Sequence, residues 1–352
     1  MKYKLFGRTG LRVSEIALGT ATFGTRWGWG ADREASRVLF DRFVEAGGNF
    51  FDCADGYQNG ESESLLGEFI RSDRDAFAIS TKYTSAAGAK SLLKTGNSLK
   101  GMMHSLEGSL KRLGTDYVDL FWVHFSDLVT PTEEILRGFD DVVRSGKARY
   151  VGFSDFPAWR VARAATIAEL RGWAPVTAVQ VEFSLAERSA EREFFPMADG
   201  LGLAVVIWAA LGGGILTGKY RRGEEGRRER GGGAVRGMSG EQESRIIEAI
   251  EAVGRGAGAS PAQVAIAWVR AKTAAYTGST AMPIIGARTL EQLDDNLGAL
   301  PLVLDEAHVE MLDAASAQPL GFPHELLTRD TMQSVQTGGY WSDLIKPSQT
   351  IA

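Results

Sequence analysis

Residues 47–61 read Gly-Gly-Asn-Phe-Phe-Asp-Cys-Ala-Asp-Gly-Tyr-Gln-Asn-Gly-Glu. An apolar run ends at Asp52, a turn that contains Tyr57 follows, and a helical pattern covers residues 62–70. This order predicts a strand, a loop and a helix. The carboxylate and the phenol then lie at the C-terminal edge of a parallel sheet, where α/β enzymes hold their reactive groups. The alternative is that Asp52 only caps a turn and that Tyr57 only packs within the loop.

Apolar runs of strand length recur along the chain, with helical patterns between them. Strands are expected at residues 16–19, 48–52, 77–82, 117–124, 149–154, 176–181, 203–208 and 282–285. Helices are expected at residues 32–46, 62–71, 98–113, 132–145, 157–171, 189–200, 241–270 and 289–299. This alternation predicts a (β/α)8 TIM barrel. A doubly wound sheet is the competing fold, but no linker divides the chain and no glycine-rich dinucleotide fingerprint follows the first strand.

The two ends of the chain lie outside this repeat. Residues 2–20 alternate and turn at Gly7–Gly10, which predicts an N-terminal β-hairpin before the first barrel strand. We expect one domain over residues 1–352, with the barrel at about 14–300 and a C-terminal extension at about 301–352.

The composition is typical of a globular protein. Hydrophobic residues make up 44%, charged residues 24%, and the net charge of −5 argues against nucleic-acid binding. The single cysteine, Cys53, excludes an intrachain disulfide framework and fits a reducing compartment; a nucleophilic role beside Asp52 is the less favoured alternative. The N-terminus has no apolar signal region, and no segment approaches the ~18 apolar residues of a membrane span. A cytoplasmic protein is expected, and its oligomeric state is left open.

Two further predicted strands end in reactive side chains. Residues 77–82 end in Lys82, and residues 117–124 end in His124. Together with Asp52 and Tyr57, these side chains are expected to converge on one face of the barrel. A lysine after an apolar run requires a partner, and Asp52 can supply the opposite charge. No histidine or carboxylate pair has metal-ligand spacing, so no metal site is expected.

These four side chains suit the reduction of a carbonyl group. A phenol has a pKa of about 10, and a nearby ammonium such as that of Lys82 lowers it. Tyr57 can then protonate a carbonyl oxygen while a hydride reaches the carbon, and His124 can donate a hydrogen bond to that oxygen.

The chain resembles the aldo-keto reductases over about residues 3–315, with the family's motifs in order. They are Gly-Arg-Thr-Gly-Leu-Arg-Val-Ser at 7–14, Phe-Asp-Cys-Ala-Asp-Gly-Tyr at 51–57, Ser-Glu-Ser-Leu-Leu-Gly at 62–67, Ser-Thr-Lys at 80–82, Ser-Leu-Lys-Arg-Leu-Gly-Thr-Asp-Tyr-Val-Asp-Leu at 109–120, Val-Gln-Val-Glu-Phe-Ser-Leu at 179–185, Leu-Gly-Gly-Gly-Ile-Leu-Thr-Gly-Lys-Tyr at 211–220 and Pro-Ile-Ile-Gly-Ala-Arg-Thr-Leu-Glu-Gln-Leu-Asp-Asp-Asn-Leu at 283–297. The resemblance implies a tetrad in which Tyr57 is the general acid, Lys82 lowers its pKa, Asp52 pairs with Lys82, and His124 orients the carbonyl.

The resemblance also implies NADPH as the cofactor. The nicotinamide end is expected at Gly19, Thr20, Ser154, Asp155, Gln180 and Trp208, with Trp208 stacked on the ring. The pyrophosphate is expected along Leu211, Gly212, Gly214, Leu216 and Lys219, and the adenosine at Gly286, Arg288, Gln292, Asp295 and Asn296. Arg288 is expected to bind the 2′-phosphate, which suits a guanidinium.

Four residues depart from the family pattern. Cys53 stands in place of Thr, Gln58 in place of Gly, Phe125 in place of Trp or Arg, and Asp155 in place of Asn. Only the last bears directly on the cofactor. An ionised Asp155 can accept a hydrogen bond from the carboxamide NH₂ group but cannot donate one to its oxygen, so we expect a shifted nicotinamide affinity.

The substrate pocket is expected to be walled by Trp27, Trp29 and Phe125. Large aromatic side chains flanked by glycines on a loop of the catalytic face are costly to leave in water, which suggests that they line a pocket. Tyr340 and Trp341 either close the pocket from above or pack on the outside of the barrel.

Residues 221–237 contain six arginines, three glutamates and six glycines. This segment is either a solvated insertion or a basic flap near an anionic ligand.

The expected partner is a small carbonyl compound: aryl aldehydes and ketones, sugars and a ketone intermediate of secondary metabolism all remain open. The alternatives to a reductase are a non-catalytic, cofactor-sensing subunit and an alcohol or sugar dehydrogenase that runs oxidatively.

Overall fold

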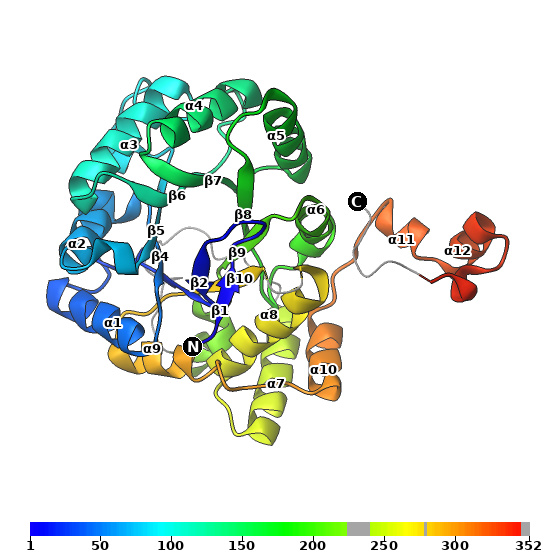
Figure 1. Cartoon of the computed structure of the whole chain (residues 1–352). Coiled ribbons are helices and arrows are strands. Elements are labelled where there is room, and N and C mark those ends of the chain that lie inside the picture. The colour runs from blue at the N-terminus through cyan, green and yellow to red at the C-terminus, as the bar shows by residue number, and fades with distance from the viewer. Residues whose placement is uncertain (224–239, 278–279, 346–352) are drawn as a thin grey trace.

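A closed barrel of eight parallel strands forms the centre of the computed structural model, which describes residues 1–223, 240–277 and 280–345 (Figure 1). The strands are β3 (Ala17–Gly19), β4 (Phe50–Asp52), β5 (Ala78–Tyr83), β6 (Val118–Val123), β7 (Ala148–Ser154), β8 (Val176–Glu182), β9 (Ala204–Trp208) and β10 (Ala281–Ile285). They pair in the order β10-β3-β4-β5-β6-β7-β8-β9, and β10 closes on β3. The predicted (β/α)8 barrel is confirmed.

A hairpin of β1 (Tyr3–Leu5) and β2 (Arg12–Ser14) covers the N-terminal end of the barrel (Figure 1). Phe6 and Val13 of this hairpin are fully buried and share a core cluster with Phe50, Trp122 and other inward-facing residues of the strands. Because side chains fill this end, the tetrad side chains lie at the opposite end of the strands, where the cavity described below opens.

Helices surround the barrel as the sequence predicts. They are α1 (Arg33–Glu45), α2 (Glu61–Ile70), α3 (Leu99–Leu113), α4 (Thr132–Arg144), α5 (Ala158–Arg171), α6 (Phe194–Leu201), α7 (Gly240–Ala257), α8 (Pro261–Thr277) and α9 (Leu290–Leu297). Polar side chains cap several of them. Asp32 accepts a hydrogen bond from Ala35 N at 2.9 Å at the start of α1, and Thr289 accepts one from Gln292 N at 3.3 Å at the start of α9.

Two predicted helix boundaries are wrong. The single helix expected at 241–270 is two helices, because Gly258 has a φ of 62° and ends α7. Ser260 Oγ then accepts a hydrogen bond from Gln263 N at 3.1 Å, and Pro261 occupies the first position of α8. The helix expected at 189–200 starts at Phe194, after a short 3-10 turn.

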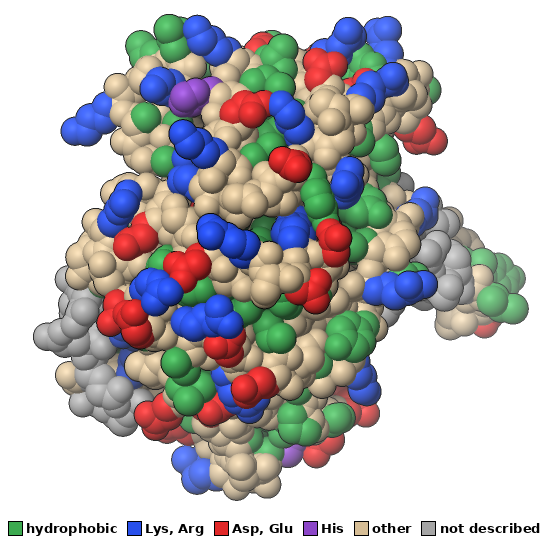
Figure 2. All heavy atoms as spheres, turned by 60° about the vertical axis from the view of Figure 1, so that its left-hand side comes forward, with side chains coloured by type: hydrophobic (Ala, Val, Ile, Leu, Met, Phe, Trp, Pro, Cys, Tyr) green, Lys and Arg blue, Asp and Glu red, His purple; other side chains and the backbone are tan. Residues whose placement is uncertain are grey.

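The outer surface carries charges of both signs. On the side that lies to the left in Figure 1, positive and negative side chains are interspersed (Figure 2). Arg33 pairs with Glu68 between α1 and α2, and Arg42 Nε lies 2.7 Å from Asp294 Oδ1 between α1 and α9. Exposed pairs of this kind contribute about 0–1 kcal/mol each, so they add little to the stability that the core supplies.

The C-terminal extension is packed at its start and separate at its end. Its first helix, α10 (Glu306–Ser316), packs against α7 and α8. The chain then forms α11 (His324–Leu327) and α12 (Asp330–Thr337), which project away from the barrel (Figure 1). Tyr340 is 67% exposed. Neither Tyr340 nor Trp341 lines the cavity described below, so the first of the two expectations for these aromatics is not met.

None of the helices that the structure describes is both long enough and apolar enough to cross a membrane.

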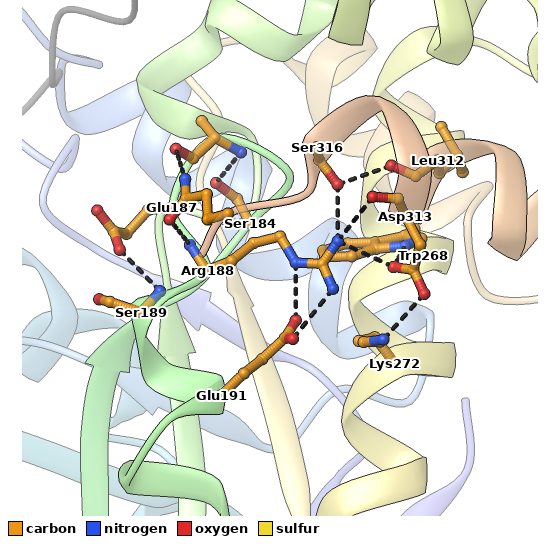
Figure 3. Close-up of polar contacts among 12 residues, drawn as sticks. Ser184, Glu187, Arg188, Ser189, Glu191, Trp268, Lys272, Leu312, Asp313 and Ser316 are labelled. Carbon is orange, nitrogen blue, oxygen red and sulfur yellow. Dashed lines mark hydrogen bonds and ion pairs between the residues drawn. The ribbon is translucent and has the colours of Figure 1, made fainter. Parts of the chain in front are cut away.

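Arg188, in the loop between β8 and α6, holds α10 in place (Figure 3). Its guanidinium donates two hydrogen bonds to the carboxylate of Glu191, at 2.9 and 3.0 Å, and one to Ser316 Oγ at 3.0 Å. It also lies 3.1 Å from Asp313 Oδ1 and 5.2 Å from the centre of the Trp268 ring. The side chain is only 9% exposed, so its charge is balanced by carboxylates rather than by water.

Asp313 connects this guanidinium to α8. Its Oδ1 accepts a hydrogen bond from Trp268 Nε1 at 3.1 Å, and its Oδ2 lies 2.9 Å from Lys272 Nζ (Figure 3). One buried network therefore joins the β8–α6 loop, α8 and α10.

We expect Arg188→Met to lower the free energy of unfolding by about 3 kcal/mol, because it leaves Glu191 buried without its counter-charge. Urea denaturation followed by circular dichroism measures this change. The control is Arg192→Met, which removes an exposed hydrogen bond to Pro319 O and is expected to change stability by less than about 1 kcal/mol. Equal losses for the two variants would show that the buried network contributes no more than a surface contact.

Candidate active site

One cavity of about 560 Å³ opens at the C-terminal end of the barrel strands. Its lining includes Asp52 from the end of β4, Tyr57 from the loop after it, and His124 from the end of β6. From there the cavity extends past the ends of β7, β8 and β9 to the loop between β10 and α9. The cavity thus has a tetrad end and a far end, with room for an elongated ligand.

Lys82 lies behind the lining residues of the tetrad end and is fully buried. Its Nζ donates hydrogen bonds to Asp52 Oδ2 at 2.6 Å, to Cys53 O at 2.7 Å and to Tyr57 OH at 3.1 Å. The parallel pairing of β4 with β5 sets this contact, because Asp52 lies opposite Ser80 and Lys82 is two residues farther along the same face. The structure brings the predicted tetrad together.

A second set of contacts fixes the carboxylate of Asp52. Its Oδ1 accepts hydrogen bonds from Ser80 Oγ at 2.7 Å and from Gln180 Nε2 at 3.1 Å. Both carboxylate oxygens are therefore occupied, which holds the ion pair with Lys82 in one geometry.

The protonation states follow from burial and from this pair. Burial disfavours the ammonium of Lys82, but Asp52 and then Tyr57 outweigh burial and raise the pKa of Lys82. Burial also raises the pKa of the Tyr57 phenol, although Lys82 opposes this effect. Burial and the charge of Lys82 hold the pKa of His124 well below its usual range. At neutral pH the site therefore contains an ammonium, a protonated phenol and a neutral imidazole.

The pKa of Tyr57 is raised overall, although Lys82 acts on it in the expected direction. Lys82 does lower it, but the loss of hydration around the phenol is the larger effect. The net rise does not remove the proton-donor chemistry, because a phenol that holds its proton at neutral pH is still available as an acid. The ammonium then stabilises the phenolate that forms when the proton leaves.

Gln58 fixes the loop that carries Tyr57. It has a φ of 50° and is fully buried, and its Oε1 accepts a hydrogen bond from Trp27 N at 2.8 Å. Its Nε2 donates to Ala21 O and Trp29 O, both at 3.1 Å. The sequence marks Gln58 as a departure from the family pattern but does not show that it ties the two loops together.

Asp55, in the same loop, connects the loop to two other parts of the chain. Its Oδ2 accepts hydrogen bonds from Ala86 N at 2.8 Å and Ser105 Oγ at 2.6 Å, and burial raises its pKa to about 6. Sequence analysis did not select this residue, because nothing in the spacing distinguishes a buried loop carboxylate from an exposed one.

Cys53 does not have the character of a nucleophile. It is fully buried, and burial raises the pKa of its thiol to about 12.

Most of the residues expected to bind the cofactor line the cavity. These are Gly19, Ser154, Asp155, Gln180, Trp208, Leu211, Gly214, Lys219, Gly286, Arg288, Gln292, Asp295 and Asn296. Thr20, Gly212 and Leu216 do not line it. Thr20 is buried and donates its hydroxyl to Asp52 O at 3.1 Å, while Leu216 belongs to the hydrophobic core.

Sequence analysis missed several lining residues, chiefly small or apolar ones such as Thr22, Ala209, Gly213, Ala262 and Ala287. Their side chains carry no chemical signal of ligand binding, so only the folded backbone identifies them.

The residues present fit a nicotinamide dinucleotide. Ser154 Oγ is buried and has no hydrogen-bond partner among the described residues, as expected for a group that binds a ligand amide. Gly213 and Gly214 have φ values of 67° and 97°, and a Cβ atom on Gly214 would lie 2.8 Å from Lys219 Nζ. Backbone without side chains beside a lysine is a suitable surface for a phosphate.

Hydrogen bonds connect the polar residues at the far end of the cavity. Arg288 N donates to Gln292 Oε1 at 2.9 Å, and Asn296 Nδ2 donates to Gly286 O at 3.2 Å. Asp295 Oδ1 accepts from Ser260 Oγ at 2.6 Å, which connects this loop to the start of α8.

The aromatic residues expected to bind substrate differ in position. Trp29 lines the cavity, whereas Trp27 and Phe125 do not. The Trp27 ring lies 5.4 Å from that of Trp29 and 6.2 Å from that of Tyr57, and the Phe125 ring lies 5.2 Å from that of His124. These aromatics therefore stand beside the reactive groups at the tetrad end. The segment at residues 221–237, interpreted as either a solvated insertion or a basic flap, falls almost wholly outside the described residues.

No group of three or more histidine, cysteine or acidic side chains suited to a metal occurs within the part of the chain that the structure describes.

Comparison with known proteins agrees with this geometry. The sequence model of the aldo/keto reductase family matches residues 15–317. A norsolorinic acid reductase of Aspergillus flavus is 35% identical over 343 residues, which cover 95% of this chain and 85% of that protein. An aryl-alcohol dehydrogenase [NADP(+)] of Phanerodontia chrysosporium is 36% identical over 340 residues, covering 90% and 86%. The oxidoreductase YrpG of Bacillus subtilis, described as uncharacterized, is 36% identical over 333 residues, covering 91% and 98%.

Proposed function

The chain belongs to the aldo/keto reductase family and is an oxidoreductase, and from this premise we propose that it reduces an aryl aldehyde or ketone to the alcohol with NADPH. The observation that carries the proposal is the contact of 3.1 Å between the OH of Tyr57, which lines the cavity, and the buried Nζ of Lys82. A proton donor held against a fixed positive charge suits the protonation of a carbonyl oxygen.

Tyr57 donates its proton to the carbonyl oxygen of the substrate. Lys82 stabilises the phenolate that remains, and Asp52 keeps Lys82 charged and in position. The neutral imidazole of His124 donates a hydrogen bond to the same oxygen and carries no charge that would oppose the ammonium. NADPH, when bound, supplies the hydride that reaches the carbonyl carbon.

Residues along the cavity would hold this cofactor. Ser154 and Gln180 would bind the carboxamide, with Trp208 beside the ring, and Lys219 would bind the pyrophosphate. Asn296 and Arg288 would hold the adenosine end, with the guanidinium on the 2′-phosphate. The name of the Phanerodontia relative, which specifies NADP(+), supports the choice of NADPH over NADH.

The preference for aryl substrates rests on the aromatic side chains at the tetrad end. Trp29 lines the cavity there, with Trp27 packed against it. Flat apolar substrates gain about 25 cal/mol for each Å² of apolar area that they bury against such rings. The relatives named for norsolorinic acid and for aryl alcohols are consistent with this class.

A panel of aryl, aliphatic and sugar carbonyl compounds, assayed with NADPH and with NADH, tests the proposal as a whole. A cofactor-sensing subunit would bind NADPH without appreciable turnover of any compound. A dehydrogenase that runs oxidatively would show its highest kcat/KM with an alcohol and NADP+.

We expect Tyr57→Phe to lower kcat for carbonyl reduction by about 10³ while the Kd for NADPH stays unchanged, because only the proton donor is lost. Stopped-flow reduction and calorimetric titration measure the two quantities. The matched control is Tyr150→Phe, which removes the hydroxyl of a tyrosine in β7 near the N-terminal end of the barrel. A Tyr57→Phe enzyme within tenfold of wild-type kcat would exclude Tyr57 as the acid.

We expect Arg288→Ala to raise the Kd for NADPH by about tenfold or more and to leave the Kd for NADH almost unchanged, since only NADPH carries the 2′-phosphate. NADH is the internal control in this comparison. Equal weakening of both cofactors would mean that Arg288 does not bind that phosphate.

We expect Trp29→Ala to raise KM for an aryl aldehyde by about tenfold, which corresponds to the loss of about 50 Å² of apolar contact. Trp27→Ala should have a smaller effect, because Trp27 supports Trp29 without lining the cavity. KM for a short aliphatic aldehyde serves as the control. The substrate assignment fails if both variants keep wild-type KM for aryl compounds.

A further inference from the structure

Asp155 places a carboxylate at the tetrad end of the cavity. It follows Ser154 at the end of β7, and its φ of 48° is in the left-handed region. Its side chain lines the cavity, and its Oδ1 accepts a hydrogen bond from Trp208 Nε1 at 3.0 Å. The Asp155 side chain therefore has one fixed oxygen and one that is open to a ligand.

The backbone connects Asp155 to the tetrad. Asp155 N donates to Gln180 O at 3.2 Å, and Gln180 Nε2 in turn donates to Asp52 Oδ1 at 3.1 Å. A ring that delivers a hydride to a carbonyl beside Tyr57 must lie at this end of the cavity. Asp155, Trp208 and Tyr57 all line this end.

Two other carboxylates line the cavity, and each has polar partners in the protein. Asp52 is paired with Lys82, and Asp295 is held at the far end by Ser260 and Gln263. Asp155 has no ion pair within 4.0 Å among the described residues.

The remaining titratable groups that face Asp155 do not cancel its charge. Tyr57 and His124 are uncharged at neutral pH, and Lys82 is neutralised by Asp52. Lys219, on the loop after β9, has its Nζ 4.9 Å from the centre of the Tyr220 ring. Within the described residues, the carboxylate of Asp155 at the tetrad end therefore has no ion-pair partner, although the charge of Lys82 still acts on it.

We propose that the carboxylate of Asp155, fixed beside Trp208 at the tetrad end of the cavity, binds the oxidised nicotinamide ring more tightly than the reduced ring. The physical reason is charge: the ring is a cation in NADP+ and neutral in NADPH. Loss of the hydride creates a positive charge within reach of Asp155, so the bound equilibrium shifts toward alcohol and NADP+. The inference rests on the proposed NADPH-dependent function and adds a specific role for the residue that departs from the family pattern.

The expected change in the relative affinity for NADP+ and NADPH is large enough to measure. At an effective dielectric constant of about 20 to 40, an isolated charge several Å from the ring changes an equilibrium constant on the order of tenfold. Burial raises the pKa of Asp155 to about 6, while Trp208 and Lys82 oppose that rise. The carboxylate is charged above this pH and neutral below it, so the preference for NADP+ is present at high pH and is lost as the pH falls.

The test is the ratio of the Kd for NADPH to the Kd for NADP+, measured by isothermal titration calorimetry. At about pH 7.5 we expect this ratio to be about tenfold higher for the wild type than for Asp155→Asn. At about pH 5 the wild-type ratio should fall to that of the variant, whose own ratio should not change with pH. Asparagine keeps the shape and can still accept from Trp208, and any hydrogen bond that its NH₂ group donates to the carboxamide is available to both forms of the cofactor and cancels in the ratio. The 2′-phosphate is common to both cofactors, and its titration cancels in the ratio.

Asp295→Asn is the matched control. It neutralises a carboxylate in the same cavity at the far end, and should change both Kd values by the same factor. Equal wild-type and Asp155→Asn ratios at about pH 7.5, or a wild-type ratio that does not respond to pH, would overturn the inference. Failure of the wild type to bind either cofactor would instead refute the proposed function itself. If Asp155→Asn does not fold, the wild-type pH dependence still decides the question.

Discussion

The buried ion pair between Lys82 and Asp52 is the constraint on which the catalytic end of the barrel depends. A fully buried ammonium is tolerated only with a close counter-charge and filled hydrogen-bond positions, and here Nζ has three oxygen partners within 3.1 Å. Each partner lies on or after β4. The position of Tyr57 is therefore coupled to the pairing of β4 with β5, and the reactive phenol is held by the same contacts that make the buried charge acceptable.

The part of the site that sequence analysis predicted is the part that the barrel topology determines. Asp52, Lys82 and His124 each follow an apolar run, and parallel strands bring the residues at their ends to one edge. Predicting their convergence therefore required only that the strands be located correctly in the sequence. The net shift of the Tyr57 pKa was not predictable in the same way, because it depends on how much water the folded cavity excludes.

Other features depend on contacts between residues far apart in the sequence. Gln58 joins its own loop to the loop that holds Trp27, and Arg188 joins the β8–α6 loop to a helix more than a hundred residues later. An isolated glutamine or arginine carries no sequence signal for such a partner. The break between α7 and α8 does have a sequence signal, because Gly258 and Pro261 mark it. The helical pattern of residues 241–270 continues across the break, however, and concealed that signal.

The fixed charges at the tetrad end are opposite in sign to the charges that the proposed reaction would create there. Before hydride transfer, the Lys82–Asp52 pair is neutral overall, His124 is uncharged, and the phenol of Tyr57 holds its proton. In the proposed reaction, transfer would leave a phenolate and a cationic nicotinamide ring. Lys82 is in contact with the first, and the Asp155 carboxylate lines the cavity region that would hold the second. Each charge that the proposed reaction would create thus has an opposite charge already fixed at the tetrad end, so little reorganisation of the protein would be required. The proposed role of Asp155 therefore makes the position after Ser154 one that affects the energy of the reaction.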